Sequence, residues 1–149
     1  MITFIGNFKS LLLVVYAGLI VFLPSCNRNT VSGGNGNKEI VINNITVEEA
    51  AVMIGERHDN PSFVVLDVRT SYEFTAGHLE NARNIDYNSN AFSDSLSTLD
   101  HNYTFLVYCH SGNRSGKAVE LMKARGFTHL YNMLGGFAEW QNKGYPVVR

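Results

Sequence analysis

The chain has 149 residues, which is enough for one domain with a sizeable hydrophobic core. Its formal net charge is -1 and its Lys and Arg residues do not cluster, which argues against a protein that binds nucleic acid through a basic surface. The two cysteines, Cys26 and Cys109, allow one disulfide at most.

Residues 1–25 are predicted to be a signal peptide of the lipoprotein type. Their apolar segment, 11–23, suits the core of a signal peptide and is shorter than the ~20 residues that span a bilayer. The sequence LPSC at 23–26 resembles the lipobox of bacterial lipoproteins, with Pro24 in place of the usual small or β-branched residue. The resemblance implies that Cys26 is lipidated, and therefore not available for a disulfide. The alternatives are an uncleaved membrane anchor and an ordinary signal peptide.

The signal predicts an exported protein that is held at a membrane by its lipid anchor and faces the periplasm or the cell exterior. Asn27 is not the Asp that is associated with inner-membrane retention in some bacteria, which favours the outer membrane. Residues 26–37 are polar and rich in Gly, so we expect them to form a flexible tether. The folded domain is then expected to comprise residues 38–149.

Strand-like and helix-like patterns alternate throughout this domain. Thr46 and Glu49 form a capping-box pattern at the start of the first expected helix. The expected elements are a strand over 39–45, a helix over 47–58, a strand over 63–68, a short helix over 71–77, a short strand over 82–86, a weak helix over 91–99, a strand over 103–109, a helix over 116–126, a strand over 129–134 and a helix over 135–144. Strict alternation predicts an α/β fold with a central parallel sheet and helices on both faces.

Cys109 ends the most apolar expected strand, and ligands of such sheets bind beyond the carboxyl ends of the strands. The loop HSGNRSG, residues 110–116, leads from this strand into a helix, whose first backbone N–H groups favour an anion. Gly112 can adopt a positive φ and turn the amides inward, and Arg114 adds a permanent positive charge. A thiol in that position should have a lowered pKa and react as a thiolate.

The residues of this loop are also compatible with purely structural roles. Cys109 can be a structural cysteine packed in the core. Three polar residues are common at helix starts and so can cap the helix as well as bind a ligand: Ser111, Asn113 and Ser115. His110 is either a proton partner or cationic neighbour of the thiolate, or a residue that lines the mouth of the site or faces solvent. The remaining histidines are scattered singly without zinc-ligand spacing, and we expect neither a metal nor a cofactor.

Three segments stand out, CHSGNRS at 109–115, LDVRTSYEFTAGHLENARNI at 66–85 and LGGFAEWQNKGYPV at 134–147. They resemble the single-domain members of the rhodanese family, and the likeness covers residues 45–149. CHSGNRS is similar to the active-site loop of the family, and LDVRTSYEFTAGHLENARNI resembles the signature that precedes it. LGGFAEWQNKGYPV resembles the end of the family domain. Asn81 departs from the usual Gly, but Asn tolerates left-handed backbone better than other residues. Asp86 departs from the common Pro.

The resemblance implies a sulfurtransferase. Cys109 would take a sulfane sulfur from a small donor such as thiosulfate, hold it as a persulfide, and pass it to a thiophilic acceptor such as cyanide. The resemblance assigns substrate binding to the active-site loop, whose residues are His110, Ser111, Gly112, Asn113, Arg114 and Ser115. Asp67 and Arg69 are expected to support the loop, Asp67 by capping backbone amides and Arg69 by pairing with Glu73.

Two other classes of function remain open. One is a sulfur-carrier or binding module that has no turnover of its own. The other is a phosphatase or arsenate reductase of a related fold. Those enzymes use a similar thiolate loop with one more residue than the four that separate Cys109 from Arg114.

Overall fold

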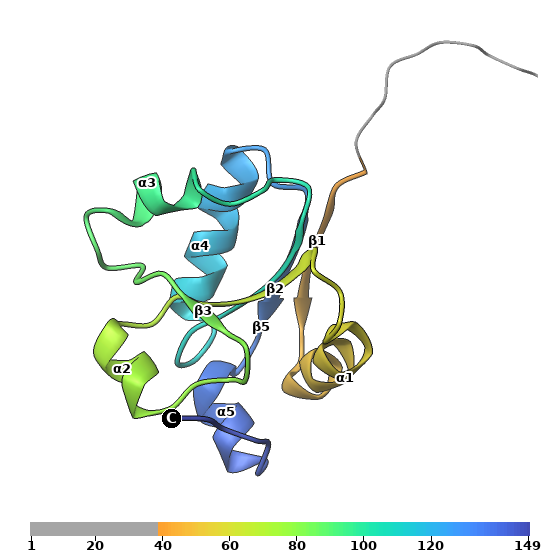
Figure 1. The fold of residues 1–149 in the computed structure, drawn as a ribbon, viewed down its shortest axis with the longest axis vertical. Helices are drawn as coiled ribbons and strands as arrows, with labels where there is room; N and C mark the ends of the chain where they lie inside the picture. Colours follow the sequence, from red (N-terminus) through yellow and green to blue (C-terminus); the bar gives the residue numbers. More distant parts are fainter. Residues whose placement is uncertain (1–38) are drawn as a thin grey trace, which may run out of the picture. The chain divides into compact units, whose positions relative to one another are not determined.

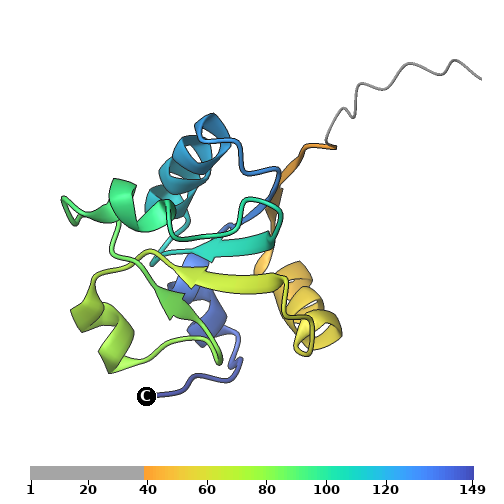
Figure 2. The same cartoon turned by 45° about the horizontal axis from the view of Figure 1, so that its top comes forward.

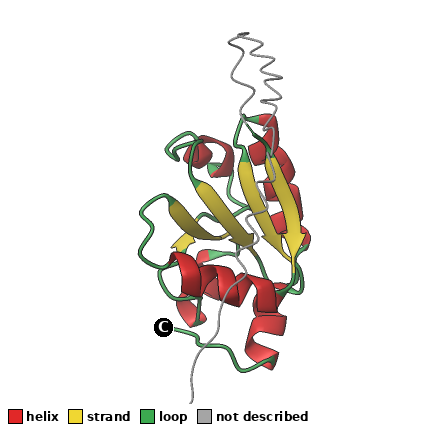
Figure 3. Cartoon of the chain, turned by 90° about the vertical axis from the view of Figure 1, so that its right-hand side faces the viewer, coloured by secondary structure: helices red, strands yellow, loops and turns green. Residues whose placement is uncertain are grey.

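The computed structural model describes residues 39–149, in which five strands and five helices alternate strictly (Figures 1 and 3). The elements are β1 (Val41–Ile45), α1 (Val47–Arg57), β2 (Phe63–Asp67), α2 (Ser71–Ala76), β3 (Arg83–Asn84), α3 (Phe92–Leu96), β4 (Thr104–Tyr108), α4 (Asn113–Ala124), β5 (His129–Met133) and α5 (Gly136–Asn142). Every element expected from the sequence is present, and most are a few residues shorter than expected.

The strands form one sheet in the order β1-β5-β4-β2-β3, and all of its pairs are parallel. Strand β4 lies between β5 and β2, and four of its five residues are buried. In the register of β2 with β4, Asp67 lies beside Tyr108, so the two strands end at the same edge of the sheet. This arrangement confirms the α/β fold class and places Cys109 at the carboxyl edge of the central strand.

Helices cover both faces of the sheet (Figure 2). On one face α3 and α4 pack on Phe105 and Val107, and on the other α1 and α5 pack on Leu106 and Tyr108. The alternation of side chains along β4 explains this division, since successive residues of a strand point to opposite faces. Cys109 continues the alternation and belongs to the core beneath α4.

Two helices, α1 and α2, begin with a capping box. The one expected at Thr46 and Glu49 is present at the start of α1. A second, at Thr70 and Glu73, begins α2 and was not expected from the sequence. In each, the Thr hydroxyl accepts a bond from the Glu N–H while the Glu carboxylate accepts one from the Thr N–H, which satisfies two otherwise unpaired donors.

Helix α4 begins earlier than predicted, at Asn113 instead of Gly116. Gly112 precedes it with a φ of 93°, a left-handed conformation that costs a glycine little. The turn is therefore completed within a short loop, and Arg114 and Ser115 belong to the first turn of the helix. Asn81 also has a positive φ, of 58°, as its position in place of a usual glycine predicts.

Three predictions lie outside the described residues, namely the signal peptide, the lipidation of Cys26 and the tether. In the part of the chain that the structure describes, no helix has the length and apolar character needed to cross a membrane.

Candidate active site

Cys109 follows the last residue of β4 and is almost fully buried, with 1% of its surface exposed. The loop that follows turns back over it, because Gly112 adopts its left-handed conformation and directs its N–H at the sulfur. The distance from that nitrogen to Sγ is 3.2 Å. The side chain oxygen of Ser115, in the first turn of α4, lies 3.6 Å from the same sulfur. The sulfur therefore lies beside the N–H of Gly112 and the hydroxyl of Ser115.

The environment lowers the pKa of Cys109. Burial is the largest influence and opposes ionisation, because a charged sulfur loses solvation. Hydrogen bonds to the sulfur outweigh it, first from the backbone N–H of Ser115 and then from the N–H groups of Ser111 and Gly112, and the nearby hydroxyl of Ser115 favours the thiolate when it turns to the sulfur. A thiolate at a helix start is a strong nucleophile, so the buried cysteine has the electrostatics of a reactive residue.

Arg114 forms a two-pronged ion pair with Glu73 of α2. Its Nη1 and Nη2 donate to the two carboxylate oxygens at 2.8 and 2.7 Å. The hydrogen bond from Arg114 lowers the pKa of Glu73 to about 2, against the effect of burial and with help from Thr70. The pKa of Arg114 is raised, first by Glu73 and to a smaller extent by Cys109. The guanidinium is thus fixed beside the thiol by a residue 41 positions away in the sequence.

Asp67 and Arg69 form a buried ion pair, and the predicted contact between Arg69 and Glu73 is wrong. Asp67 accepts the backbone N–H of Arg69 at 2.8 Å, as its expected capping role requires, and also accepts the guanidinium. Arg69 in addition donates to the carbonyl of Gly77 at 2.7 Å and lies over the ring of Phe137 at 3.8 Å. The pair links the end of β2 to α2 and α5, and its support of the active-site loop stays a prediction.

The start of α5 holds the active-site loop through its backbone. The N–H of Phe137 donates to the carbonyl of Cys109 at 2.8 Å, and that of Ala138 to the carbonyl of His110 at 3.0 Å. Gly136 allows this approach, since a Cβ there would lie 2.5 Å from the Cys109 carbonyl oxygen. These contacts give a physical reason for the Gly-Gly pair of the closing motif.

A chain of polar side chains runs behind the thiol and was not expected from the sequence. Ser115 donates its hydroxyl proton to Oδ1 of Asn132 at 2.6 Å, and Nδ2 of Asn132 donates to Oδ1 of Asn44 at 2.9 Å. Ser115 is fully buried and Asn132 is 5% exposed, whereas Asn44 is exposed on β1. An Asn between Tyr131 and Met133 in an expected strand is the signal that could have revealed this network, because buried amides are nearly always hydrogen-bonded.

The remaining loop residues lie at the mouth of the site. His110, Ser111 and Asn113 are exposed, and His110 lines a shallow groove together with Phe137 and the exposed Tyr72. Of the six residues of the predicted binding loop, Ser111, Gly112 and Ser115 contact the sulfur, and their role in binding stays a prediction.

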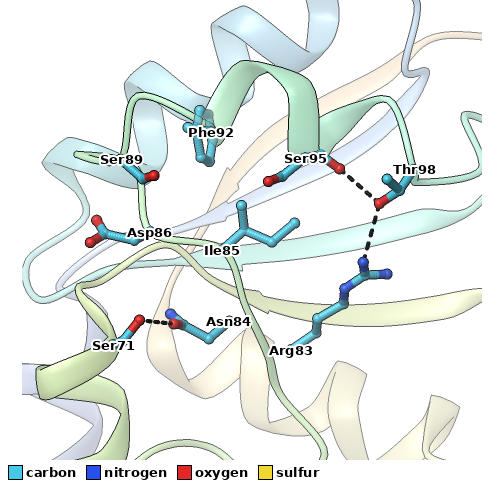
Figure 4. A pocket seen from close by; sticks show the side chains of 9 residues that line it. All are labelled: Ser71, Arg83, Asn84, Ile85, Asp86, Ser89, Phe92, Ser95 and Thr98. Atoms are coloured by element: carbon cyan, nitrogen blue, oxygen red, sulfur yellow. Dashed lines mark hydrogen bonds between the residues drawn. The ribbon is translucent and has the colours of Figure 1, made fainter.

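A second groove, between β3 and α3, contains none of these residues (Figure 4). It is lined mainly by polar side chains, several of which bond to one another. Arg83 donates to Thr98 at 3.2 Å and Ser71 to Asn84 at 3.3 Å. None of its lining residues is a cysteine or a histidine, and among the described residues the free cysteine is Cys109.

Several relatives and solved structures are similar to this chain. Thiosulfate sulfurtransferase GlpE of Pseudomonas putida is 37% identical over 84 residues, which is 56% of this chain and 74% of that protein. A tRNA uridine(34) hydroxylase of Photorhabdus laumondii is 32% identical over 107 residues, 65% of this chain but 30% of that protein.

The solved structures agree with the sequence relatives. A rhodanese-related protein from Thermoplasma volcanium has a TM-score of 0.59 and 29% identity, over 71% of this chain and 97% of that one. A rhodanese-like domain protein from Staphylococcus aureus has a TM-score of 0.58 and 27% identity, over 72% of this chain and 99% of that one. A family profile described as the rhodanese-like domain matches residues 46–143. The chain belongs to the rhodanese-like domain family.

Proposed function

We propose that this chain is a sulfurtransferase that carries sulfane sulfur on Cys109. The observation that carries the proposal is a buried thiol whose pKa is lowered by donors converging from the loop and from the first turn of α4. The name of the Pseudomonas putida relative supports thiosulfate as the donor.

The proposed reaction has two steps. The Cys109 thiolate attacks the outer sulfur of thiosulfate, the S–S bond of thiosulfate breaks, and sulfite leaves with the bonding electron pair. The resulting persulfide then loses its outer sulfur to cyanide, which forms thiocyanate and restores the thiolate. Negative charge stays near the sulfur throughout, so the N–H groups of the loop and Arg114 stabilise both steps.

The size of the loop supports sulfur over phosphate as the transferred group. Four residues separate Cys109 from Arg114, and a ring of amides that short leaves little room for the oxygens of a tetrahedral phosphate. A terminal sulfur is a single atom and needs only a few N–H contacts. A displacement of about 1 Å between reacting groups costs on the order of a hundredfold in rate, so one residue of loop length is enough to decide the substrate.

Assays of the same preparation with thiosulfate and cyanide, with an aryl phosphate and with arsenate test this proposal. We expect sulfur transfer that Cys109→Ser abolishes, and no phosphatase or arsenate reductase activity. Hydrolysis of the aryl phosphate that disappears in Cys109→Ser would overturn the assignment. Persulfide formation without turnover to thiocyanate would instead identify a sulfur-carrier module.

The sequence before the domain supports a location for this activity. The apolar segment 11–23 and the lipobox-like LPSC support export, lipidation at Cys26 and attachment to a membrane, with the domain facing the periplasm or the cell exterior. Stable attachment needs more than one acyl chain, as a lipoprotein provides, because one chain alone binds a membrane only marginally.

A further inference from the structure

The hydroxyl of Ser115 has a single proton and two neighbouring acceptors. Oδ1 of Asn132 lies 2.6 Å away, within the usual range of a strong O–H···O bond, and the sulfur of Cys109 lies 3.6 Å away. The proton can serve only one of them at a time. The shorter distance places it on Asn132, with the oxygen lone pairs of Ser115 toward the sulfur.

The amide of Asn132 is held in the orientation that makes it an acceptor for Ser115. Its Nδ2 donates to Asn44 at 2.9 Å, so its Oδ1 must point the other way. Asn132 lies in β5 between β1 and β4 and is 5% exposed, and together with Asn44 it lines a groove beside α4. Asn44, on the exposed edge strand, thus orients the side-chain amide of Asn132, and this amide in turn holds the hydroxyl proton of Ser115.

We propose that Asn132 is a positioning residue, which competes with the Cys109 sulfur for the Ser115 proton and so sets how readily the sulfur carries negative charge. A neutral thiol can donate its own proton to Ser115 in the observed arrangement. A thiolate or a persulfide anion gains this donor only when the hydroxyl turns from Asn132 to the sulfur. A role of Asn132 in turnover rests on the proposed sulfur transfer. Its influence on the ionisation of the Cys109 thiol does not depend on that proposal.

Charged groups near the thiol do not account for this competition. Arg114 on α4 is paired with Glu73 on α2, and Asp67 is paired with Arg69 at the end of β2. His110 is at the mouth, and Glu120 and Lys123 lie along the groove that Asn44 and Asn132 line. Ser115 and Asn132 are neutral, so replacing them leaves all of these charged groups in the chain. A change in the ionisation of Cys109 in such variants can therefore be assigned to the hydroxyl proton of Ser115.

The experiment measures the rate of Cys109 alkylation by iodoacetamide against pH in the full chain. Following the Cys109 peptide by mass spectrometry keeps Cys26 out of the measurement. Asn132→Leu has a similar size and no acceptor, so the Ser115 proton is free for the sulfur and the midpoint of the profile should fall. Ser115→Ala removes the donor, so the midpoint should rise. A hydrogen bond to a charged group is strong enough to change the thiolate fraction at a fixed pH about tenfold in each direction.

The double variant provides the control. If Asn132 acts only through Ser115, then Asn132→Leu combined with Ser115→Ala should match Ser115→Ala alone. Thermal unfolding checks that each variant is folded. Should Asn132→Leu fail to fold, Asn44→Ala replaces it, because releasing the amide at the exposed edge allows Asn132 to rotate and should lower the midpoint by a smaller amount.

A midpoint that rises or stays unchanged in Asn132→Leu or Asn44→Ala would overturn the proposal, as would additive shifts in the double variant. A merely structural Asn132 would lower thermal stability and leave the midpoint in place. Because alkylation requires no sulfur donor, the shifts can be observed even if the thiosulfate assay fails, and each proposal is judged separately.

Discussion

Gly136→Ala should disrupt the site without touching any side chain of the active-site loop. The residue has a φ of 58°, and an added Cβ would lie 2.5 Å from the carbonyl oxygen of Cys109 and 2.7 Å from that of His110. Ordinary contacts begin near 3.4 Å, so the loop and the start of α5 must separate by about 0.9 Å. That movement also stretches the hydrogen bond from Phe137 to Cys109. A shift of about 1 Å predicts a loss on the order of a hundredfold in sulfur-transfer rate.

Gly144→Ala is the matched control. Its φ of 73° imposes a similar backbone strain, but no atom lies within 4 Å of the added Cβ. Both variants should lose about 1 kcal/mol of stability from the left-handed backbone, and Gly136→Ala about 1 to 3 kcal/mol more from the steric overlap. Thermal unfolding and the thiosulfate and cyanide assay measure the two effects. Full activity in folded Gly136→Ala, or an equal loss in Gly144→Ala, would refute this account of the loop.

Three more changes test the surroundings of the thiol and the anchor. Glu73→Gln should lower the free energy of unfolding by about 1 kcal/mol at neutral pH, a value that includes the screening of the ion pair by solvent. The pKa of Glu73 is lowered from 4.5 to about 2 in the folded state, so the stability difference between the two proteins should be complete above pH 4.5 and vanish as the pH falls toward 2. Denaturation curves that show the same difference at every pH would contradict this prediction. Arg114→Lys should lower sulfur transfer at least about tenfold, since an ammonium cannot make the two parallel bonds to Glu73, and an unchanged rate would count against a role for the guanidinium. Cys26→Ser should release the domain into the soluble fraction or leave the precursor uncleaved, whereas normal processing with unchanged membrane retention would argue against lipidation.

Local sequence patterns were sufficient to predict most of the fold. The β-branched run of β2 and the apolar run of β4 identify buried parallel strands, and the spacing of Thr46 and Glu49 identifies the start of α1. The start of α4 was predicted too late, because the polar residues Asn113 and Arg114 give no apolar period. What fixes that start is the left-handed turn at Gly112, and its conformation depends on the loop that closes over Cys109.

Contacts between distant segments could not be predicted in the same way. The sequence places Cys109 at a strand end before a helix, but it does not reveal that Glu73 reaches across to Arg114, or that Arg69 pairs with Asp67 instead. The fold brings Glu73 to Arg114, whereas Arg69 pairs with Asp67, which is only two residues away, because both lie at the end of β2. The bond from Ser115 to Asn132 also depends on the fold, because α4 packs on the strand that follows it in the chain.

Intact mass of the protein after incubation with thiosulfate tests the central claim most directly. The account predicts a gain of one sulfur atom, located on the Cys109 peptide, lost again on addition of cyanide and absent from Cys109→Ser. A folded protein that gains no sulfur under these conditions, or one that gains it equally in Cys109→Ser, would contradict the assignment of Cys109 as the residue that carries the transferred sulfur.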